Sequence, residues 1–336
     1  MNIVVAKGGS IQTDLESKPK LMPNHVMIRT VCSAISPGTE LMIARRPNKE
    51  AVPLGYSAAG YVEDIDGECP GLTIGQRVAC YGGPYVRHAE WLCVPRNLVV
   101  PIPDSVGFEE ASFVGLGAIA IHALRKASLQ FGETVVVVGL GIIGQLVCQI
   151  ASAASYRVLA YDLLSERNGQ LKSLVPGAFV ADSLEALNSE ASRQSGGAGV
   201  DAVLLCANGP DGSLIDYGLR CVRQQGHVVI VGDMKLDFNR ELLFAKEANV
   251  TVSKAGGPGR GDLAYERNGH DYPIGYVRWT EGRNMREYLQ MLERRSIRIS
   301  SLISEEVPFS QVLRAYERYK MMPQQTMGML IRYDHY

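Results

Sequence analysis

The chain has 336 residues, which is more than one hydrophobic core usually covers, so we expect two domains. Apolar residues make up 46% and charged residues 21%, a composition that excludes a disordered chain. The 34 basic and 35 acidic residues leave a net charge of -1, so no overall field favours nucleic acid or an anionic membrane as a partner.

Targeting and cysteine patterns predict a cytoplasmic protein. The N-terminal stretch MNIVVAKGGS lacks the long apolar core of a signal peptide, and no apolar run approaches the length needed to span a membrane. The seven cysteines are scattered, and none forms a Cys-x-x-Cys pair. We therefore predict neither a disulfide framework nor a structural zinc knot.

In chain order, residues 1–108 come first and look β-rich. Short segments there have strand character and are separated by Gly and Pro at strand-and-turn spacing: 25–31, 58–65 and 76–81. Pro101 and Pro103 break this pattern, and a helix is predicted over about 109–127. Acidic residues lie in the first turn of that helix and basic residues in its last.

A different pattern begins at residue 134. TVVVVG is a continuous apolar run, typical of a parallel strand buried on both faces, and a helix-like segment and the strand-like RVLAYD follow it. Further strand-like runs alternate with helical segments: AFVAD, DAVLLCA, HVVIVGD and VTVSK. This series of βαβ units predicts a doubly wound α/β domain over about 128–254.

The last part of the chain begins with residues 255–279, which show little periodicity. That is long for a plain connection, and its aromatic clusters argue against disorder, so we expect a functional loop. An amphipathic helix follows, with apolar residues at helical spacing through Leu292. A strand, a helix near 309–321 and a closing strand complete the prediction.

The strongest motif is VVVVGLGIIG at 135–144, in which Gly139, Gly141 and Gly144 have the spacing G-x-G-x-x-G. The first glycine permits a sharp strand-to-helix turn, the second lets a pyrophosphate approach the backbone, and the third lets the helix pack close to the strand. The helix that begins at Ile142 and Ile143 would then present its N–H groups to the phosphates. We predict a dinucleotide site.

Asp162 ends the second strand of this region, about 20 residues beyond the glycines. A carboxylate at that place hydrogen-bonds a ribose 2′-hydroxyl and repels a 2′-phosphate, which favours NAD over NADP. Arg167 either touches the same ribose or is a solvated helix residue, and in the first case it leaves NADP open.

On these residues and on three further segments, the chain resembles the medium-chain dehydrogenase/reductase superfamily. More narrowly, it resembles the alcohol-dehydrogenase-like half of bi-domain oxidoreductases that are met beside sugar-processing genes. The segments are ISPGTEL (35–41), VRHAEWLCVPRNLVVPIPD (86–104) and HDYPIGYVRWTEGRNM (270–285).

The resemblance implies a GroES-like β-rich catalytic domain over 1–127 and a Rossmann NAD-binding domain over 128–254. The chain would then return to the catalytic domain over 255–336. Such folds commonly form homodimers through the edge of the nucleotide-domain sheet, which VTVSK (250–254) would supply here.

The chain departs from the zinc members of the superfamily at the ligand positions. Their early Cys falls at Ser36 in this sequence, and their His-Glu dipeptide falls at Tyr56 and Ser57. Neutral Ser and Tyr are poor zinc ligands, and the lobe with four closely spaced cysteines is absent. We therefore expect a zinc-independent member with no bound metal.

Without a metal, side chains must stabilise charge on the reacting oxygen and one group must exchange its proton. The catalytic candidates are Tyr56, His88, Glu40 and Ser36. Tyr56 is an oxyanion donor, a base with a lowered pKa, or a half-buried aromatic that fills the place of the metal. His88 is either a group that titrates near neutral pH or a strand histidine bonded to the backbone. Glu40 hydrogen-bonds a substrate hydroxyl, relays a proton, or is a helix-start carboxylate.

The substrate-binding candidates are Thr39, Ser57, Asp271, Tyr276 and Arg278, with Ser57 alternatively a small local spacer. We predict that the loop 256–279 covers the cleft in which the substrate binds, and that Gly256 approaches the nicotinamide of the cofactor. Gly115 and Gly117 either contact the cofactor or allow close helix packing. Polar side chains in the loop suit a hydroxyl-rich small molecule.

Three functions remain open from the sequence. The first is an NAD(H)-linked, zinc-independent enzyme that interconverts a secondary alcohol and a ketone on a sugar- or cyclitol-like metabolite. The second is an NAD(P)H-dependent reductase of activated C=C bonds, which Asp162 argues against. The third is a nucleotide-binding partner protein without turnover.

Overall fold

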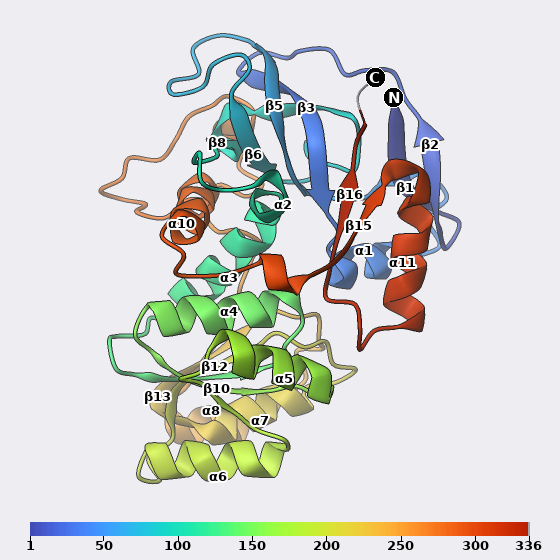
Figure 1. Ribbon diagram of the computed structural model, residues 1–336. Coiled ribbons are helices and arrows are strands. Elements are labelled where there is room, and N and C mark those ends of the chain that lie inside the picture. The colour runs from blue at the N-terminus through green and yellow to red at the C-terminus, as the bar shows by residue number, and fades with distance from the viewer. Residues whose placement is uncertain (335–336) are drawn as a thin grey trace. The chain divides into compact units, whose positions relative to one another are not determined.

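The computed structural model describes residues 1–334, and the chain divides into two compact units (Figure 1). Unit 1 contains Met1–Ala118, Gly256–Arg295 and the segment from Ile299 onward, whereas unit 2 contains Ile119–Ala255 and Ser296–Arg298. From the sequence, we predicted that the first domain ends at residue 127, after a helix. The structure divides the chain at 118, inside that helix, where the composition gives no signal.

Unit 1 is built on a seven-stranded sheet in the order β15-β16-β3-β5-β6-β8, with β7 also paired to β3. Its strands pair antiparallel except β15 with β16, which are parallel. The strands are β3 (His25–Ala34), β5 (Ser57–Ile65), β6 (Arg77–Tyr81), β7 (Trp91–Pro95), β8 (Val99–Pro101), β15 (Ile303–Pro308) and β16 (Gly328–Arg332). The predicted β-rich region is confirmed.

A second, three-stranded sheet in unit 1 has the order β2-β1-β4. Its strands are β1 (Asn2–Lys7), β2 (Ser10–Leu15) and β4 (Val52–Pro53). The helices of unit 1 are α1 (Pro37–Arg45), α2 (Phe108–Ala111), α9 (Leu263–Glu266), α10 (Glu281–Glu293) and α11 (Val312–Met321). The helix predicted over 109–127 is in fact two helices, α2 and α3 (Val114–Lys126).

The helix α11 covers a separate apolar core of unit 1. Val4, Ile35 and Leu54 contribute to this core from the first part of the chain. The buried face of α11 contributes Val312, Ala315, Tyr316 and Tyr319. Segments that are distant in sequence therefore meet on this face.

Unit 2 contains a six-stranded, wholly parallel sheet in the order β11-β10-β9-β12-β13-β14. In Figure 1, α4 lies on one face of this sheet, and α6, α7 and α8 lie on the other. The strands are β9 (Thr134–Val138), β10 (Arg157–Tyr161), β11 (Phe179–Val180), β12 (Val200–Leu205), β13 (Val222–Ile230) and β14 (Asn249–Val252). The order is that of a dinucleotide-binding sheet, as the βαβ pattern predicted.

The central strand β9 is buried at every residue, which explains why its sequence is apolar without alternation. The helices that cover the sheet of unit 2 are α4 (Ile142–Ala153), α5 (Ser165–Leu174), α6 (Leu184–Gln194), α7 (Ser213–Cys221) and α8 (Arg240–Lys246). The seven cysteines, all within the described residues, are free thiols.

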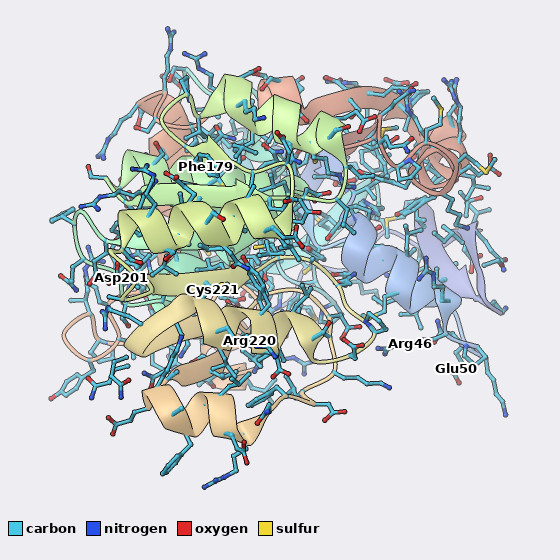
Figure 2. All side chains as sticks on the ribbon, turned by 90° about the horizontal axis from the view of Figure 1, so that it is seen from below. Arg46, Glu50, Phe179, Asp201, Arg220 and Cys221 are labelled. Carbon is cyan, nitrogen blue, oxygen red and sulfur yellow. The ribbon has the colours of Figure 1, made fainter. Side chains whose placement is uncertain are left out.

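No helix among residues 1–334 is long and apolar enough to cross a membrane. Charged residues instead extend from the surface, as Arg46 and Glu50 do in the segment that follows α1 (Figure 2).

Candidate active site

The glycine loop joins β9 to α4 in unit 2, and two of its glycines are required by close contacts. Gly139 has a φ of +94°, and an added Cβ would lie 2.5 Å from the backbone nitrogen of Ala207. A Cβ at Gly144 would lie 1.9 Å from the carbonyl oxygen of Gly139. The first turn of α4 therefore packs against the strand end only because residue 144 has no side chain.

The second glycine, Gly141, is the N-cap residue of α4, and no side chain caps this helix. A Cβ at Gly141 would meet only Arg167 Nη1, at 3.9 Å, so the backbone is open there. The first N–H groups of a helix have no intrahelical partner, and with the helix dipole they favour an anion. The loop from Gly139 to Ile143 therefore fits the pyrophosphate of a dinucleotide.

Asp162 follows β10 and is 7% exposed. Its Oδ2 accepts a hydrogen bond from the Leu140 N–H at 2.6 Å, and its Oδ1 accepts one from the Leu164 N–H at 2.9 Å. The carboxylate therefore ties the glycine loop to the end of β10. Its predicted contact with a ribose stays a prediction.

Arg167 is neither simply solvated nor remote from the loop. Its Nη1 lies 3.4 Å from Asp162 Oδ2, and among residues 1–334 it is the one near neighbour of the open face at Gly141. A guanidinium therefore stands beside the place predicted for the ribose and pyrophosphate.

Two residues that the sequence did not single out hold this corner together. Asn168 accepts a hydrogen bond from the Asp162 N–H and donates one to its carbonyl oxygen, both at 2.9 Å. Gln145 donates to the Arg167 carbonyl oxygen at 2.9 Å. These amide side chains meet their partners only in the folded chain, and no residue spacing in the sequence predicts the hydrogen bonds that they form.

In unit 1, Gly55 and Tyr56 form the turn that leads into β5. Gly55 has a φ of +93°, and a Cβ there would lie 2.7 Å from the His88 backbone nitrogen, so only glycine fits the turn. The Tyr56 hydroxyl donates to Ser36 Oγ at 2.5 Å, and Thr39 also hydrogen-bonds it. Three hydroxyls therefore gather where α1 begins.

Burial raises the pKa of Tyr56 to about 12, and the nearby Glu40 carboxylate adds to the effect. The expectation of a base with a lowered pKa is therefore wrong. A phenol with this pKa stays protonated at neutral pH and acts as a hydrogen-bond donor.

Glu40 and His88 lie behind these hydroxyls and are 1% and 0% exposed. Glu40 Oε1 accepts the Ser36 N–H at 2.7 Å, and Glu40 Oε2 lies 3.0 Å from His88 Nε2. The other ring nitrogen, His88 Nδ1, lies 2.7 Å from Ser33 Oγ. Both side chains are thus enclosed behind the hydroxyls, and their part in catalysis stays a prediction.

Ser57 is also enclosed and bonds locally, in keeping with the alternative of a small local spacer. Its hydroxyl donates to the Ser112 carbonyl oxygen at 2.5 Å and accepts the Gly115 N–H at 2.8 Å. A Cβ at Gly115 would lie 2.4 Å from Tyr81, and one at Gly117 would lie 2.1 Å from Tyr288. These two glycines allow close packing.

The loop 256–279 is anchored within unit 1 by polar contacts. The Gly256 N–H donates to the Tyr81 hydroxyl at 3.0 Å, and the Asn284 amide donates to the Gly256 carbonyl at 2.7 Å. Farther along, Arg260 pairs with the buried Glu266 at 3.2 Å. Tyr81, which holds the backbone of Gly256 in place, was not among the residues singled out from the sequence.

The three substrate candidates in this loop contact solvent and their own neighbours. Asp271 pairs with Arg283 at 2.8 Å, Tyr276 is 91% exposed, and the Arg278 guanidinium lies 3.8 Å from the centre of the Trp279 ring. Their part in substrate binding remains a prediction.

The donor set at the family's ligand positions does not suit zinc. Zinc in proteins takes thiolate, imidazole or carboxylate ligands, whereas Ser36, Tyr56 and Ser57 offer neutral hydroxyls that are bonded to protein groups. Among residues 1–334, no three His, Cys, Asp or Glu side chains gather as a metal site would require.

Comparison with known proteins gives related dehydrogenases. Residues 143–266 match the family described as zinc-binding dehydrogenase. The chain is 23% identical to sorbitol dehydrogenase from Homo sapiens, over 95% of this chain and 92% of that protein. It is 26% identical to "Probable D-xylulose reductase A" from Emericella nidulans, over 65% of this chain and 70% of that protein.

The structure is similar to galactitol-1-phosphate dehydrogenase from Escherichia coli, with a TM-score of 0.80 and 19% identity, over 99% of this chain and 100% of that one. These matches support the medium-chain dehydrogenase/reductase superfamily that the sequence resembles. Within that class, the matches support an alcohol/ketone oxidoreductase of the NAD(H)-dependent dehydrogenase type.

Proposed function

We propose that this protein is an NAD(H)-linked oxidoreductase that interconverts a secondary alcohol and a ketone on a polar, sugar- or cyclitol-like metabolite without catalytic zinc. The observation that carries the proposal is the Tyr56–Ser36 hydroxyl pair, 2.5 Å apart, at positions where zinc members have metal ligands. The polyol and ketose names of the relatives support the substrate class.

NAD(H), when bound, supplies the hydride acceptor or donor, and the glycine loop with Asp162 and Arg167 would hold it. The chain's own part is to manage the reacting oxygen. A donor aimed at that oxygen stabilises the negative charge that grows there during hydride transfer. Tyr56 is the donor in this proposal, with Ser36 and Thr39 beside its hydroxyl.

The pKa of Tyr56 sets the direction of proton transfer. In ketone reduction, the growing alkoxide is a stronger base than the Tyr56 phenolate, so the phenol gives up its proton to it. In alcohol oxidation the phenolate must take up that proton, and a pKa of about 12 keeps the phenolate scarce near neutrality. We therefore expect oxidation to speed up as the pH rises toward that value.

The test is hydride transfer followed by NADH absorbance, with sorbitol, xylitol and galactitol as oxidation probes and D-fructose and D-xylulose as reduction probes. We expect turnover that survives exhaustive chelation in protein shown by metal analysis to hold no zinc. About one zinc per chain, with activity lost on chelation, contradicts the metal-free part. Turnover of cyclohexenone with NADPH, and of no polyol with NAD, favours a C=C reductase instead.

The proposal includes a homodimer through β14, the edge strand of the sheet in unit 2. An unpaired strand edge is a template for a second chain, and Val252 on β14 is 53% exposed. Light scattering after gel filtration tests this, and Val252→Lys should shift the wild-type mass toward the monomer. A monomeric wild type would remove the dimer from the proposal.

A further inference from the structure

We propose that Tyr316, near the end of the chain, is a positioning residue that acts on the Tyr56–Ser36 pair through Glu40. The inference rests on the proposed function. It assigns to α11 a part in the chemistry, beyond its contribution to the core.

The geometry centres on Glu40, whose two carboxylate oxygens are used by three different segments. Oε1 accepts the Ser36 N–H at 2.7 Å. Oε2 is shared, because the Tyr316 hydroxyl donates to it and His88 Nε2 lies 3.0 Å away. These partners lie 4, 48 and 276 residues from Glu40 in sequence.

Such a carboxylate is expensive to bury without partners. Transfer of an ionised carboxylate out of water is strongly unfavourable even after relaxation, and hydrogen bonds must offset this. An apolar side chain would fill the same space without that penalty. That the protein buries a carboxylate among three hydrogen-bond donors therefore indicates that the orientation of this carboxylate and its partners matters.

The histidine in the cluster is itself held from the other side. His88 Nδ1 lies 2.7 Å from Ser33 Oγ, and Ser33 Oγ lies 2.9 Å from the buried hydroxyl of Tyr333. The ring is fixed at both nitrogens, so it cannot turn to compensate for a donor lost at Glu40. Of the three donors to Glu40, Tyr316 is thus the one whose hydroxyl can be removed with the least effect on the rest of the cluster.

The effect reaches Tyr56 through the start of α1. Ser36 is the N-cap residue of α1, yet its hydroxyl caps no backbone N–H, because it accepts the Tyr56 hydroxyl instead. The position of Ser36 is set by Glu40, whose side chain takes the Ser36 N–H and whose own N–H donates to the Ser36 carbonyl oxygen at 3.0 Å. Loosening Glu40 therefore loosens the acceptor that aligns Tyr56.

The same helix supplies a matched control. Tyr319 is buried on α11 beside Tyr316, but its hydroxyl donates to the Met327 carbonyl oxygen at 3.2 Å and not to Glu40. Tyr316→Phe and Tyr319→Phe each remove one buried hydroxyl bond, so they should lower thermal stability to a similar extent. Only the first removes a donor from Glu40.

The experiment compares wild type, Tyr316→Phe and Tyr319→Phe in the full chain, with sorbitol and xylitol as probes and NAD as cofactor. We expect kcat to fall about tenfold in Tyr316→Phe with the KM for NAD unchanged, since alignment and not cofactor binding is lost. In Tyr319→Phe, kcat should stay within about twofold of wild type. A spectroscopic readout is nitrogen NMR of the histidine rings, in which the His88 signals should shift only in Tyr316→Phe, because His88 and Tyr316 share Glu40 Oε2.

Equal kcat values in the two variants, with an active wild type, overturn the inference and leave the proposed function standing. A wild type that turns over neither probe counts against the proposed function, and the NMR comparison then decides the inference alone. Identical His88 signals in all three proteins overturn it, and a shift confined to Tyr316→Phe supports it.

Discussion

The glycine loop of unit 2 and the hydroxyl site of unit 1 are built in opposite ways. In the loop, the groups that would bind a ligand are backbone N–H groups, and their partners lie within about one βαβ unit of sequence. In the hydroxyl site, the groups that act are side chains, and the bonds that orient them join residues as far apart as Ser33 and Tyr333.

This difference decides how each region tolerates change. The loop depends on the absence of side chains at Gly139 and Gly144, so small additions damage it. The hydroxyl site depends on single polar atoms, so it is sensitive to the removal of an oxygen while the fold remains. Three substitutions test the contrast, each with a control, and a fourth tests acid stability; they follow in order of decreasing effect.

The largest effect is expected for Gly144→Ala. The new Cβ would lie 1.9 Å from the Gly139 carbonyl oxygen, so the backbone must shift where strand and helix meet. We expect NADH affinity to fall by at least about 100-fold and stability to fall by roughly 3 kcal/mol. Fluorescence titration with NADH and thermal unfolding measure the two effects.

Gly169→Ala is the control, because Gly169 lies on α5 with nothing within 4 Å of an added Cβ. That change should stabilise the helix by up to about 1 kcal/mol and leave NADH binding as it was. Equal behaviour of the two alanine variants would show that the close approach at residue 144 is unimportant.

Next comes Tyr56→Phe, which removes one oxygen from the other region. If Tyr56 donates to the reacting oxygen, kcat should fall about 100-fold while NADH affinity stays the same. The rise of alcohol oxidation with pH should also disappear, because the phenol with a pKa of about 12 is gone. Steady-state rates between pH 7 and 10 measure both.

The matched variant is Tyr61→Phe on β5, the strand that follows Tyr56, where the ring packs edge-to-face on Phe108. It should keep wild-type rates. A Tyr56→Phe enzyme with normal kcat and an unchanged pH profile would remove Tyr56 from the mechanism.

A smaller effect is expected for Asp162→Asn, which replaces the one carboxylate on which the loop depends. An amide can accept only one of the two backbone N–H bonds that Asp162 accepts now. We expect NADH affinity to fall about tenfold and the preference for NADH over NADPH to weaken, since a bond to a charged group is worth about 1.5–3 kcal/mol.

Titration of both cofactors into Asp162→Asn and Asp182→Asn provides the measurement. Asp182 pairs only with Lys172 at an exposed site, so its variant should bind like wild type. If Asp162→Asn also binds both cofactors like wild type, the carboxylate has no part in cofactor binding.

The smallest effect concerns acid stability in unit 2. Burial, with Lys126 and Arg125 nearby, lowers the pKa of His122 from its ordinary 6.5 to about 4. The unfolded chain therefore binds a proton that the folded chain refuses, and stability is lost as the pH falls from about 6.5 toward 4. For a partly exposed group we expect a loss of about 1 kcal/mol.

His122→Gln should make urea unfolding less sensitive to acid than wild type, when midpoints at pH 7.5 and 5 are compared. Replacement of the exposed His270 by Gln should leave the wild-type sensitivity in place. Equal acid sensitivity in wild type and His122→Gln would assign the loss to other groups.

The sequence predicts the glycine loop of unit 2 better than the hydroxyl site of unit 1. The order of β9, α4 and β10 and the turn at Gly139 follow from local patterns, since a buried parallel strand is apolar throughout and a tight turn needs glycine. The split between α2 and α3 was missed, because the apolar spacing continues across it.

In the hydroxyl site, the sequence indicated residues that the fold does bring together, but it did not show which of them are enclosed. Glu40 and His88 were candidates for catalysis, and both are buried. Their enclosure depends on Tyr316 and Ser33, whose spacing from them carries no periodic signal. Only the folded chain shows such partners.

The two tyrosines that close the Glu40–His88 cluster, Tyr316 and Tyr333, are synthesised long after Glu40 and His88. Because domains tend to fold as the chain leaves the ribosome, the nucleotide-binding half can assemble while this cluster still lacks its final members. A nascent chain halted after residue 310 would then carry an intact glycine motif and an unfinished hydroxyl site.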